Sequence, residues 1–367
     1  MLSIITIIGA RPQFIKAAVF SRLVRSEKFL NYFNETIIHT GQHYDDNMSE
    51  IFFKEMTIPE PDFNLGIGGA SHGAMTGAML EKIEKILLEV KPNLVLVYGD
   101  TNSTLAGALA ASKLNIPVVH IEAGLRSFDK KMPEEQNRIL ADHLSSYLFC
   151  PTETAVKNLT KEGITDNPNK RVKVLNVGDI MFDASLYYMK QVESQPLEKR
   201  LKNRVILPES FALLTLHRAE NTDDPLKMFK IFNTIQMVCE IPIIFPVHPR
   251  TKKALMINGV KLGDKIKPID PVGYFDMLEL ESACDFILTD SGGVQKEACF
   301  FRKPCITLRD TSEWIETIES GWNTLVGSEP DLIKAAIEGR RIPSTEPDFY
   351  GDGNAAEKIA ATLLESY

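Results

Sequence analysis

Short apolar runs rich in β-branched residues alternate with amphipathic stretches along the chain, and this alternation restricts the possible folds more than any other feature. In the first half the runs are Leu2–Ile8, Thr36–His39, Asn93–Val97, Pro117–Ile121, Tyr147–Cys150 and Val172–Val177. In the second half they are Phe211–Leu216, Ile241–Val247, Lys265–Ile269, Asp285–Leu288, Pro304–Leu308 and Thr324–Val326. The intervening amphipathic stretches include Met75–Val90, Thr101–Leu114 and Glu135–Ser146. Alternation of strands and helices is typical of parallel sheets covered by helices on both faces.

The runs form two series, which indicates two doubly wound α/β domains. A chain of 367 residues also exceeds the size at which one hydrophobic core usually stops growing. The polar, lysine-rich segment Gln191–Arg204 is the expected boundary. We therefore expect one Rossmann-like domain over residues 1–190 and a second over 191–350. The segment 351–367 should form a helix that packs back on the first domain.

The composition argues against several functional classes. Net charge is −8, which provides no general attraction for nucleic acid or acidic membranes. The five cysteines form no CxxC pair, so we expect reduced, buried thiols and no zinc knuckle. No run is long enough to span a bilayer, and the N-terminus lacks a basic leader and a cleavage pattern, so a cytoplasmic protein is expected.

Ligands of open α/β sheets bind beyond the carboxyl ends of the strands, so the residues that follow each run matter most. The first run continues into Gly9-Ala-Arg-Pro-Gln-Phe-Ile-Lys16, where Arg11 and Lys16 would suit a diphosphate or simply begin a solvated helix. Neither GxGxxG nor a Walker A motif is present, which argues against a dinucleotide or a P-loop nucleotide.

Polar residues also follow the next runs of the first half. Gln42 and His43 could bind a ligand or cap the following helix, and Asp100 could equally be a helix N-cap. Glu122 ends another run, and Glu134 opens a helix that also carries Arg138. Each acid taken singly has an ordinary structural explanation, including pairing with a helix dipole. Acidic loops meeting at one sheet edge beside two cations instead favour a catalytic site.

The second half has a different pattern, suited to an anion. His217 and Arg218 follow one run, and His248 follows the next with an arginine nearby, without the spacing of a helical zinc site. Thr289-Asp-Ser-Gly-Gly-Val-Gln-Lys-Glu297 predicts a strand, a glycine turn at Ser291, Gly292 and Gly293, and a helix start. Free N–H groups at such a start bind phosphate, and Glu297 one turn later could bind a ribose diol. A plain glycine-rich turn is the alternative.

Taken together, these loops resemble the non-hydrolysing UDP-N-acetylglucosamine 2-epimerases. The segments GARPQFIKA, TGQHYD, GDTNSTLAGALAA, HIEAGLRS, PEEQNR, LHRAEN, PVHPRTKK, DPVGY and TDSGGVQKEA occur in the family's order, from Gly9 to about Gly327. The resemblance implies the GT-B architecture: two Rossmann-like domains with the active site in the cleft between them and UDP held mainly by the second. It also implies a cytoplasmic homodimer that serves polysaccharide precursor synthesis and uses neither a cofactor nor a metal.

The resemblance further implies the reaction and the residues that perform it. Family members eliminate UDP across C1–C2 to give a 2-acetamidoglucal and then add UDP back with inverted C2, interconverting UDP-N-acetylglucosamine and UDP-N-acetylmannosamine. The residues matching the family's catalytic groups are Asp100, Glu122, Glu134 and His217. Those expected to bind substrate or UDP are Arg11, Lys16, Gln42, His43, Arg138, Arg218, His248, Tyr274, Ser291, Gly292, Gly293, Glu297 and Arg309.

Two departures from the family pattern bear on the substrate, and a third bears on regulation. Gln13 replaces a usual glutamate, which favours a more anionic ligand, and Trp314 replaces an arginine, so a neutral ring stands where a cation is usual. Asp45 and the segment Ser71–Ala74 do not match members with a regulatory second UDP-sugar site. The alternatives are the same reaction on UDP-2,3-diacetamido-2,3-dideoxyglucuronate, a hydrolysing epimerase, a GT-B glycosyltransferase, or a non-catalytic binding protein.

Overall fold

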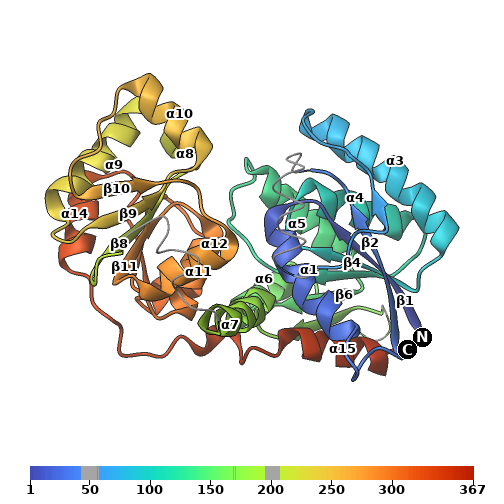
Figure 1. Ribbon diagram of the computed structural model, residues 1–367. Helices are drawn as coiled ribbons and strands as arrows, with labels where there is room; N and C mark the ends of the chain where they lie inside the picture. Colours follow the sequence, from blue (N-terminus) through green and yellow to red (C-terminus); the bar gives the residue numbers. More distant parts are fainter. Residues whose placement is uncertain (43–55, 57, 168, 170, 195–206) are drawn as a thin grey trace. The chain divides into compact units, whose positions relative to one another are not determined.

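The computed structural model describes residues 1–42, 56, 58–167, 169, 171–194 and 207–367. Within these, the chain divides into two compact units (Figure 1). Unit 1 comprises Met1–Ala184 and Phe349–Tyr367, and unit 2 comprises Ser185–Asp348. The boundary segment Gln191–Arg204 lies largely outside the described residues. No helix of the described part is long and apolar enough to cross a membrane.

Unit 1 is built on a seven-stranded sheet of order β3-β2-β1-β4-β5-β6-β7, in which every paired strand is parallel. Its strands are β1 (Leu2–Ile8), β2 (Phe33–His39), β3 (Phe63–Asn64), β4 (Leu94–Tyr98), β5 (Val118–Ile121), β6 (Tyr147–Cys150) and β7 (Lys173–Asn176). Its helices are α1 (Arg11–Val24), α3 (His72–Val90), α4 (Asn102–Lys113), α5 (Pro133–Leu144), α6 (Glu153–Lys161) and α15 (Ala355–Glu365). Helix α7 (Ile180–Glu193) begins in unit 1 and continues into unit 2.

Both faces of this sheet are covered, because successive strand residues point to opposite sides. Ile5, Ile7, Val95 and Val97 pack in one cluster with apolar residues of α3, α4 and α5. Helix α1 packs against β1, β2 and β4 and carries α15 beside it (Figure 1).

Unit 2 has a six-stranded parallel sheet of order β10-β9-β8-β11-β12-β13. Its strands are β8 (Ala212–Thr215), β9 (Ile243–Pro246), β10 (Ile266–Ile269), β11 (Phe286–Thr289), β12 (Cys305–Thr307) and β13 (Asn323–Leu325). Its helices are α8 (Ala219–Thr222), α9 (Pro225–Val238), α10 (Pro249–Asn258), α11 (Tyr274–Ala283), α12 (Gly292–Phe300), α13 (Ile315–Glu319) and α14 (Pro330–Glu338), and a 3-10 turn covers Asp348–Tyr350 at the junction with unit 1.

Two separate apolar clusters show that this sheet is doubly wound as well. Leu214 and Phe245 pack with side chains of α9 and α14. Leu213 and Ile244, the neighbouring residues in sequence, pack with side chains of α11 and α12. The fold class predicted from the alternating runs is confirmed: two Rossmann-like units, each with helices on both faces of a parallel sheet.

The order of the strands identifies where a ligand would bind in each unit. The chain winds outward in opposite directions from the pair β1 and β4 in unit 1, and from the pair β8 and β11 in unit 2. Ligands of open α/β sheets bind beyond the carboxyl ends of the strands at such a switch point. The loops after β1 and β4 in unit 1, and after β8 and β11 in unit 2, are therefore expected to form the ligand sites.

Candidate functional site

In unit 1, helix α1 is joined to the loop that follows β5 by an ion pair between Lys16 and Glu122. The two side chains are only 7% and 8% exposed. Glu122 has a φ of 71°, a left-handed conformation that is strained for a residue with a side chain. Strain of this kind persists where the surrounding structure enforces it, often at functional sites. Glu122 is therefore held in place by its backbone as well as by its cation.

The loop after β4 supplies a second ion pair, between Asp100 and Arg138 of helix α5. Asp100 remains 30% exposed, whereas Arg138 is 4% exposed. Asn137 on the same helix donates a hydrogen bond to the Asp100 carbonyl at 2.9 Å. Asp100 is not the N-cap of α4, because Thr101 holds that position and accepts from the Thr104 N–H. The structural explanation of Asp100 as a cap is thus wrong, and its carboxylate faces Arg138.

Gly99 brings the two ion pairs into one site. A Cβ atom at this position would lie 3.0 Å from Glu122 Oε2 and 3.4 Å from Lys16 Nζ. The backbone immediately before Asp100 thus contacts the Lys16–Glu122 pair. The structure thereby brings Asp100, Glu122, Lys16 and Arg138 to the switch point of unit 1.

The remaining residues expected in unit 1 lie around this centre. Arg11 begins α1 directly after the β1 turn, and Glu134 lies half-buried in the first turn of α5. Gln42 Oε1 accepts from the backbone N–H and the hydroxyl of Ser103, at 3.1 and 2.8 Å, which joins the loop after β2 to the first turn of α4. His43 and Asp45 lie outside the described residues.

Gln13 has a structural task in the turn after β1. Its amide oxygen accepts from the N–H groups of Gly9 and Ala10 at 2.8 and 3.1 Å. Its amide nitrogen donates to the Tyr98 carbonyl at 2.8 Å and to Thr104 Oγ1 at 3.0 Å. The side chain is only 1% exposed, so it shapes the turn and does not face a ligand.

Glu135 is a residue that the sequence patterns did not single out. It is buried, accepts from the N–H groups of Ser127 and Phe128 at 2.9 Å each, and contacts Arg138 Nη1 at 3.0 Å. Arg138 is therefore held between Glu135 and Asp100. The adjacent acids of the PEEQNR segment were the available signal, but sequence alone does not say which one faces inward.

In unit 2, Asp290 is the centre of the switch point, and sequence reasoning missed it. Its fully buried carboxylate accepts from the backbone N–H groups of His217 and Arg218, at 3.0 and 2.9 Å, and from Asn221 Nδ2 at 3.1 Å. The His217 ring lies over the same carboxylate, with Nδ1 at 3.3 Å. A carboxylate at Nδ1 fixes the orientation of an imidazole. The available signal was the position of Asp290 directly after β11, within the TDSGG segment; the glycines of that segment were interpreted as a phosphate-binding turn, and the acid was assigned no role.

His248 and its neighbours extend this arrangement to the end of β9. The ring of His248 lies 5.5 Å from that of His217, measured between centroids. Its Nδ1 accepts from the Arg250 N–H at 3.2 Å and caps α10. Arg250 itself turns away to Asp223, with two contacts of 2.8 and 2.7 Å.

Helix α12 begins at Gly292 directly after β11, and the Ser291 side chain makes no capping hydrogen bond there. A Cβ atom at Gly292 would approach Glu313 Oε1 to 2.6 Å, so a larger residue there would displace the Glu313 side chain. At Gly293 the nearest side-chain atoms are 3.9 Å away, which leaves that backbone open to approach. The start of α12 thus presents N–H groups and a positive dipole end, as a phosphate site requires.

Of three further expected residues in this part of unit 2, Glu297 belongs to α12 and Tyr274 to α11, and Arg309 follows β12. Arg309 is 4% exposed and lies 3.5 Å from Glu220 and 3.3 Å from Glu313. Glu297 and Tyr274 are both buried, and burial, with Glu297 as the next cause, holds the pKa of Tyr274 well above its ordinary value. The phenol is thus a neutral hydrogen-bonding group beside an acid.

Trp314 is packed within unit 2. It is 4% exposed, and Lys296 Nζ lies 4.2 Å from the centre of its ring. A cation over an indole face is a favourable contact. One face of the ring is therefore occupied by Lys296, a side chain of α12.

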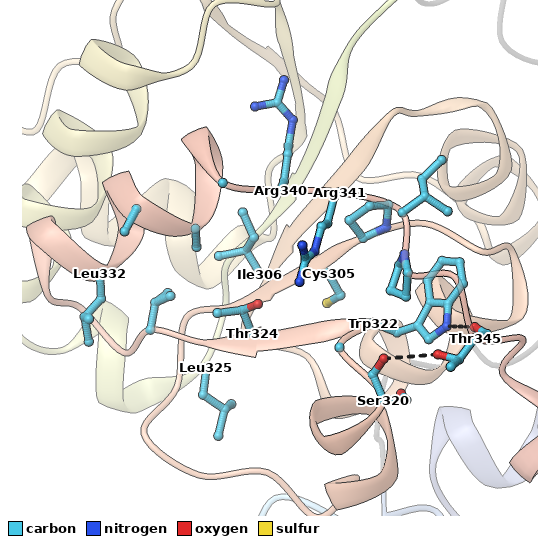
Figure 2. A pocket seen from close by; sticks show the side chains of 18 of the residues that line it. Cys305, Ile306, Ser320, Trp322, Thr324, Leu325, Leu332, Arg340, Arg341 and Thr345 are labelled. Carbon is cyan, nitrogen blue, oxygen red and sulfur yellow. Dashed lines mark hydrogen bonds between the residues drawn. The ribbon is translucent and has the colours of Figure 1, made fainter.

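A cavity of about 810 Å³ lies elsewhere in unit 2 (Figure 2). Cys305 and Trp322, at the amino-terminal ends of β12 and β13, line it together with Arg340 and Arg341. Because ligands of these sheets bind at the carboxyl ends, this cavity is separate from the residues described above. Among the residues that the structure describes, no group of three or more His, Cys, Asp or Glu side chains is arranged to hold a metal ion.

Comparison with known proteins identifies relatives across almost the whole chain. A family model described as UDP-N-acetylglucosamine 2-epimerase matches residues 28–364. A UDP-N-acetylglucosamine 2-epimerase homolog of Methanococcus maripaludis is 52% identical over 368 residues, which cover 99% of each chain. A UDP-2,3-diacetamido-2,3-dideoxy-D-glucuronate 2-epimerase of Pseudomonas aeruginosa is 50% identical, covering 99% of this chain and 100% of the relative. The crystal structure of Methanocaldococcus jannaschii UDP-GlcNAc 2-epimerase in complex with UDP-GlcNAc and UDP is similar with a TM-score of 0.88 and 46% identity, covering 99% of both chains.

Proposed function

Because the chain belongs to the UDP-N-acetylglucosamine 2-epimerase family, we propose that it interconverts UDP-N-acetylglucosamine and UDP-N-acetylmannosamine without hydrolysing them. The observation that carries the proposal is the pair of ion pairs at the switch point of unit 1. Lys16–Glu122 and Asp100–Arg138 place two carboxylates and two cations at one sheet edge. Such a set provides groups that accept and donate protons.

The chemistry requires such a set because the C2 hydrogen of the aminosugar is not adjacent to a carbonyl. A base removes the C2 proton, the C1–O bond to UDP breaks, and a C1=C2 double bond forms. UDP leaves with the electron pair of the C1–O bond. In the reverse step UDP adds to C1, and a proton reaches C2 from the opposite face. Acid–base groups of this kind typically contribute about 10²- to 10⁴-fold to the rate.

We assign proton transfer to unit 1 and UDP binding to unit 2. Asp100, Glu122 and Glu134 are the acids in the loops and helix start of unit 1. In unit 2 the start of α12 provides N–H groups for the diphosphate, and Arg309 provides a cation. Stabilising the departing diphosphate lowers the barrier to elimination. His217, oriented by Asp290, is the unit 2 residue that we assign to the reaction itself.

Elimination and re-addition exchange the C2 hydrogen with solvent, and this provides the test. The protein is incubated with UDP-N-acetylglucosamine in deuterated water, and both sugars are examined by proton NMR. We expect deuterium at C2 of the UDP-N-acetylmannosamine formed. Product that retains protium at C2 would rule out the mechanism, and free N-acetylmannosamine would indicate a hydrolysing enzyme.

A second candidate is the same reaction on UDP-2,3-diacetamido-2,3-dideoxyglucuronate. It is favoured by the 50% identity to the Pseudomonas aeruginosa enzyme. A panel that contains both UDP-sugars separates the two candidates by kcat/KM. A glycosyltransferase would instead consume UDP-sugar only when an acceptor is added.

We further propose that the protein is a cytoplasmic homodimer and supplies precursors for a cell-surface polysaccharide. These proposals rest on resemblance to the family. Light scattering coupled to size-exclusion chromatography measures the mass, which should be twice the 41.1 kDa of one chain. Deleting the gene and examining the surface polysaccharide tests the role in the cell.

A further inference from the structure

Behind the loops of unit 1 lies a cluster of four charged side chains: His120, Asp142, Arg126 and Glu162. His120 and Asp142 are 0% exposed, and His120 Nδ1 lies 2.6 Å from Asp142 Oδ1. Arg126, 1% exposed, contacts Asp142 and Glu162 at 2.7 Å each. If His120 is protonated, the cations His120 and Arg126 balance the anions Asp142 and Glu162. Burying an unbalanced charge is costly, so this neutral combination favours a protonated His120.

The hydrogen bonds determine the protonation of His120. Its Nε2 lies 2.7 Å from the Gly99 carbonyl oxygen, which only accepts, so Nε2 carries a proton. Asp142 accepts from the Gly124 N–H at 3.1 Å and from Arg126 Nη1 at 2.7 Å, as an ionised carboxylate does. Nδ1 must therefore also donate, because two acceptors 2.6 Å apart would repel each other. Both ring nitrogens carry protons, and His120 is an imidazolium.

The charges around Asp142 agree with this assignment. Burial by itself would raise the pKa of Asp142, but the neighbouring His120 and Arg126 outweigh burial and hold that pKa below its ordinary value. Other groups near the cluster are the buried Cys150 thiol, His143 at 3.8 Å from Glu162, and the Lys16–Glu122 pair beside Gly99.

The cluster connects the elements that carry the acids of the proposed reaction. His120 holds the Gly99 carbonyl, one residue before Asp100. Asp142 holds the Gly124 N–H, and Arg126 Nη1 holds the Leu125 carbonyl at 2.6 Å, both in the loop that follows Glu122. Asp142 itself belongs to α5, the helix of Glu134 and Arg138.

We propose that His120 is a positioning residue: an imidazolium that, through Gly99 and Asp142, fixes the turns carrying Asp100 and Glu122 for proton transfer at C2. It is fully buried, so it acts through these turns and does not itself exchange a proton with substrate. The inference rests on the proposed epimerase reaction. A misplacement of about 1 Å in such groups costs on the order of 10²-fold in rate.

Two substitutions separate the two hydrogen bonds of His120. The amide of His120→Gln reaches the Nε2 position and keeps the bond to Gly99, whereas His120→Asn reaches the Nδ1 position and keeps the bond to Asp142. We expect both to lower kcat for epimerisation by roughly 10- to 100-fold, with a smaller change in KM. The dissociation constant of UDP should stay within about twofold, because UDP binding is assigned to unit 2. The matched control is His143→Gln, next to Asp142 on α5 but 50% exposed, which should leave kcat unchanged.

The protonation state of His120 can also be measured by NMR in the wild-type protein, so this test does not depend on whether the variants fold. With ¹⁵N-labelled histidine, His120 should show two protonated ring nitrogens at pH 7.5. The exposed His143 ring gives a second histidine signal in the same spectrum for comparison. A neutral His120 ring at pH 7.5, or wild-type kcat in folded His120→Gln and His120→Asn, would overturn the proposal. Absence of C2 exchange in the wild type would instead reject the epimerase reaction while leaving the imidazolium assignment standing.

Discussion

Lys296 lies against the ring of Trp314, and this contact shows how a buried position limits substitution. An arginine at 314 would place a second cation beside Lys296, in a part of unit 2 where both side chains are almost fully buried. Like charges in such a place repel strongly because solvent screens them poorly. Exchanging this tryptophan for arginine therefore affects the stability of unit 2.

We accordingly expect Trp314→Arg to lower the free energy of unfolding by roughly 3–5 kcal/mol, the usual cost of an uncompensated buried charge. Adding Lys296→Glu should recover part of this loss, because the new acid pairs with the new guanidinium. Urea denaturation of the wild type, both single variants and the double variant measures the coupling between the two positions. Additive effects would mean that the two side chains do not interact.

The acids of unit 1 should govern turnover and leave nucleotide binding intact. We expect Asp100→Asn and Glu122→Gln each to lose about 10²-fold or more in kcat, the usual scale for acid–base groups. Ser291→Ala and Glu297→Ala should instead weaken UDP binding. Calorimetry with UDP and C2-exchange kinetics measure the two effects separately. Carboxylate variants that lose UDP while the unit 2 variants keep it would invert the assignment.

At the residue scale, the sequence predicted which loops carry the polar residues of the site better than it predicted the contacts that each side chain makes. Asp100, Glu122, Lys16 and Arg138 were expected in the site and do meet there. Gln13, Glu135 and His120, which hold Arg138 and the turns around this site, were not recognised from the sequence, nor was Asp290, which orients His217 in unit 2. Their importance comes from hydrogen bonds between loops distant in sequence, and no local pattern encodes such partners.

At the scale of elements, the apolar runs located the strands well. The predicted run Leu2–Ile8 coincides with β1 and Tyr147–Cys150 with β6, while the other strands differ at their ends by a few residues. Strand β3, only two residues long, has no apolar run and was missed. The order of the strands was also beyond reach, because parallel pairing joins segments far apart in the chain.

The attachment of α15 yields a prediction about pH. Asp183 accepts from the Ala355 and Ala356 N–H groups at 3.1 and 2.9 Å, at the start of α15. Burial, opposed in part by these hydrogen bonds, raises the pKa of Asp183 to about 6 from 3.8. The folded protein thus binds this proton more tightly than the unfolded chain does, so its stabilising contribution is complete below about pH 4 and lost as pH rises to about 6.

We expect this group to make the protein less stable by roughly 3 kcal/mol at pH 7 than at pH 4, when other groups are subtracted. Asp183→Asn removes the titration but keeps one acceptor oxygen. The difference in free energy of unfolding between wild type and variant should therefore shift in favour of the variant as pH rises from 4.5 to 7.5. Urea titrations at both pH values measure it, and a difference independent of pH would contradict the assignment.

At the scale of the whole molecule, the five cysteines report on the integrity of both units. All five are free and buried, as expected from the sequence. Burial raises the pKa of each thiol, to about 12 for Cys305. Thiolate is the reactive form, so native thiols should be inert.

We therefore expect Ellman's reagent to label no more than a small fraction of the thiols in minutes at pH 8, and all five once denaturant is added. Cys305 lines the cavity of Figure 2 and is the thiol to compare. The control is Cys305→Ala, which should lower the denatured count by one and leave the native rate unchanged. Rapid native labelling of several thiols would mean that the units open readily.

Unit 1 is assembled from segments on both sides of unit 2, and this affects how the chain can fold as it is made. Helix α15 lies against α1, and its first N–H groups bind an aspartate 172 residues earlier. Domains tend to fold in the order in which the ribosome delivers them, at about 5–20 residues per second. Here the ribosome delivers all of unit 2 before it delivers α15. During that interval of roughly ten seconds or more, the surface of α1 that later contacts α15 stays exposed. Chaperones could bind a newly made chain at this surface.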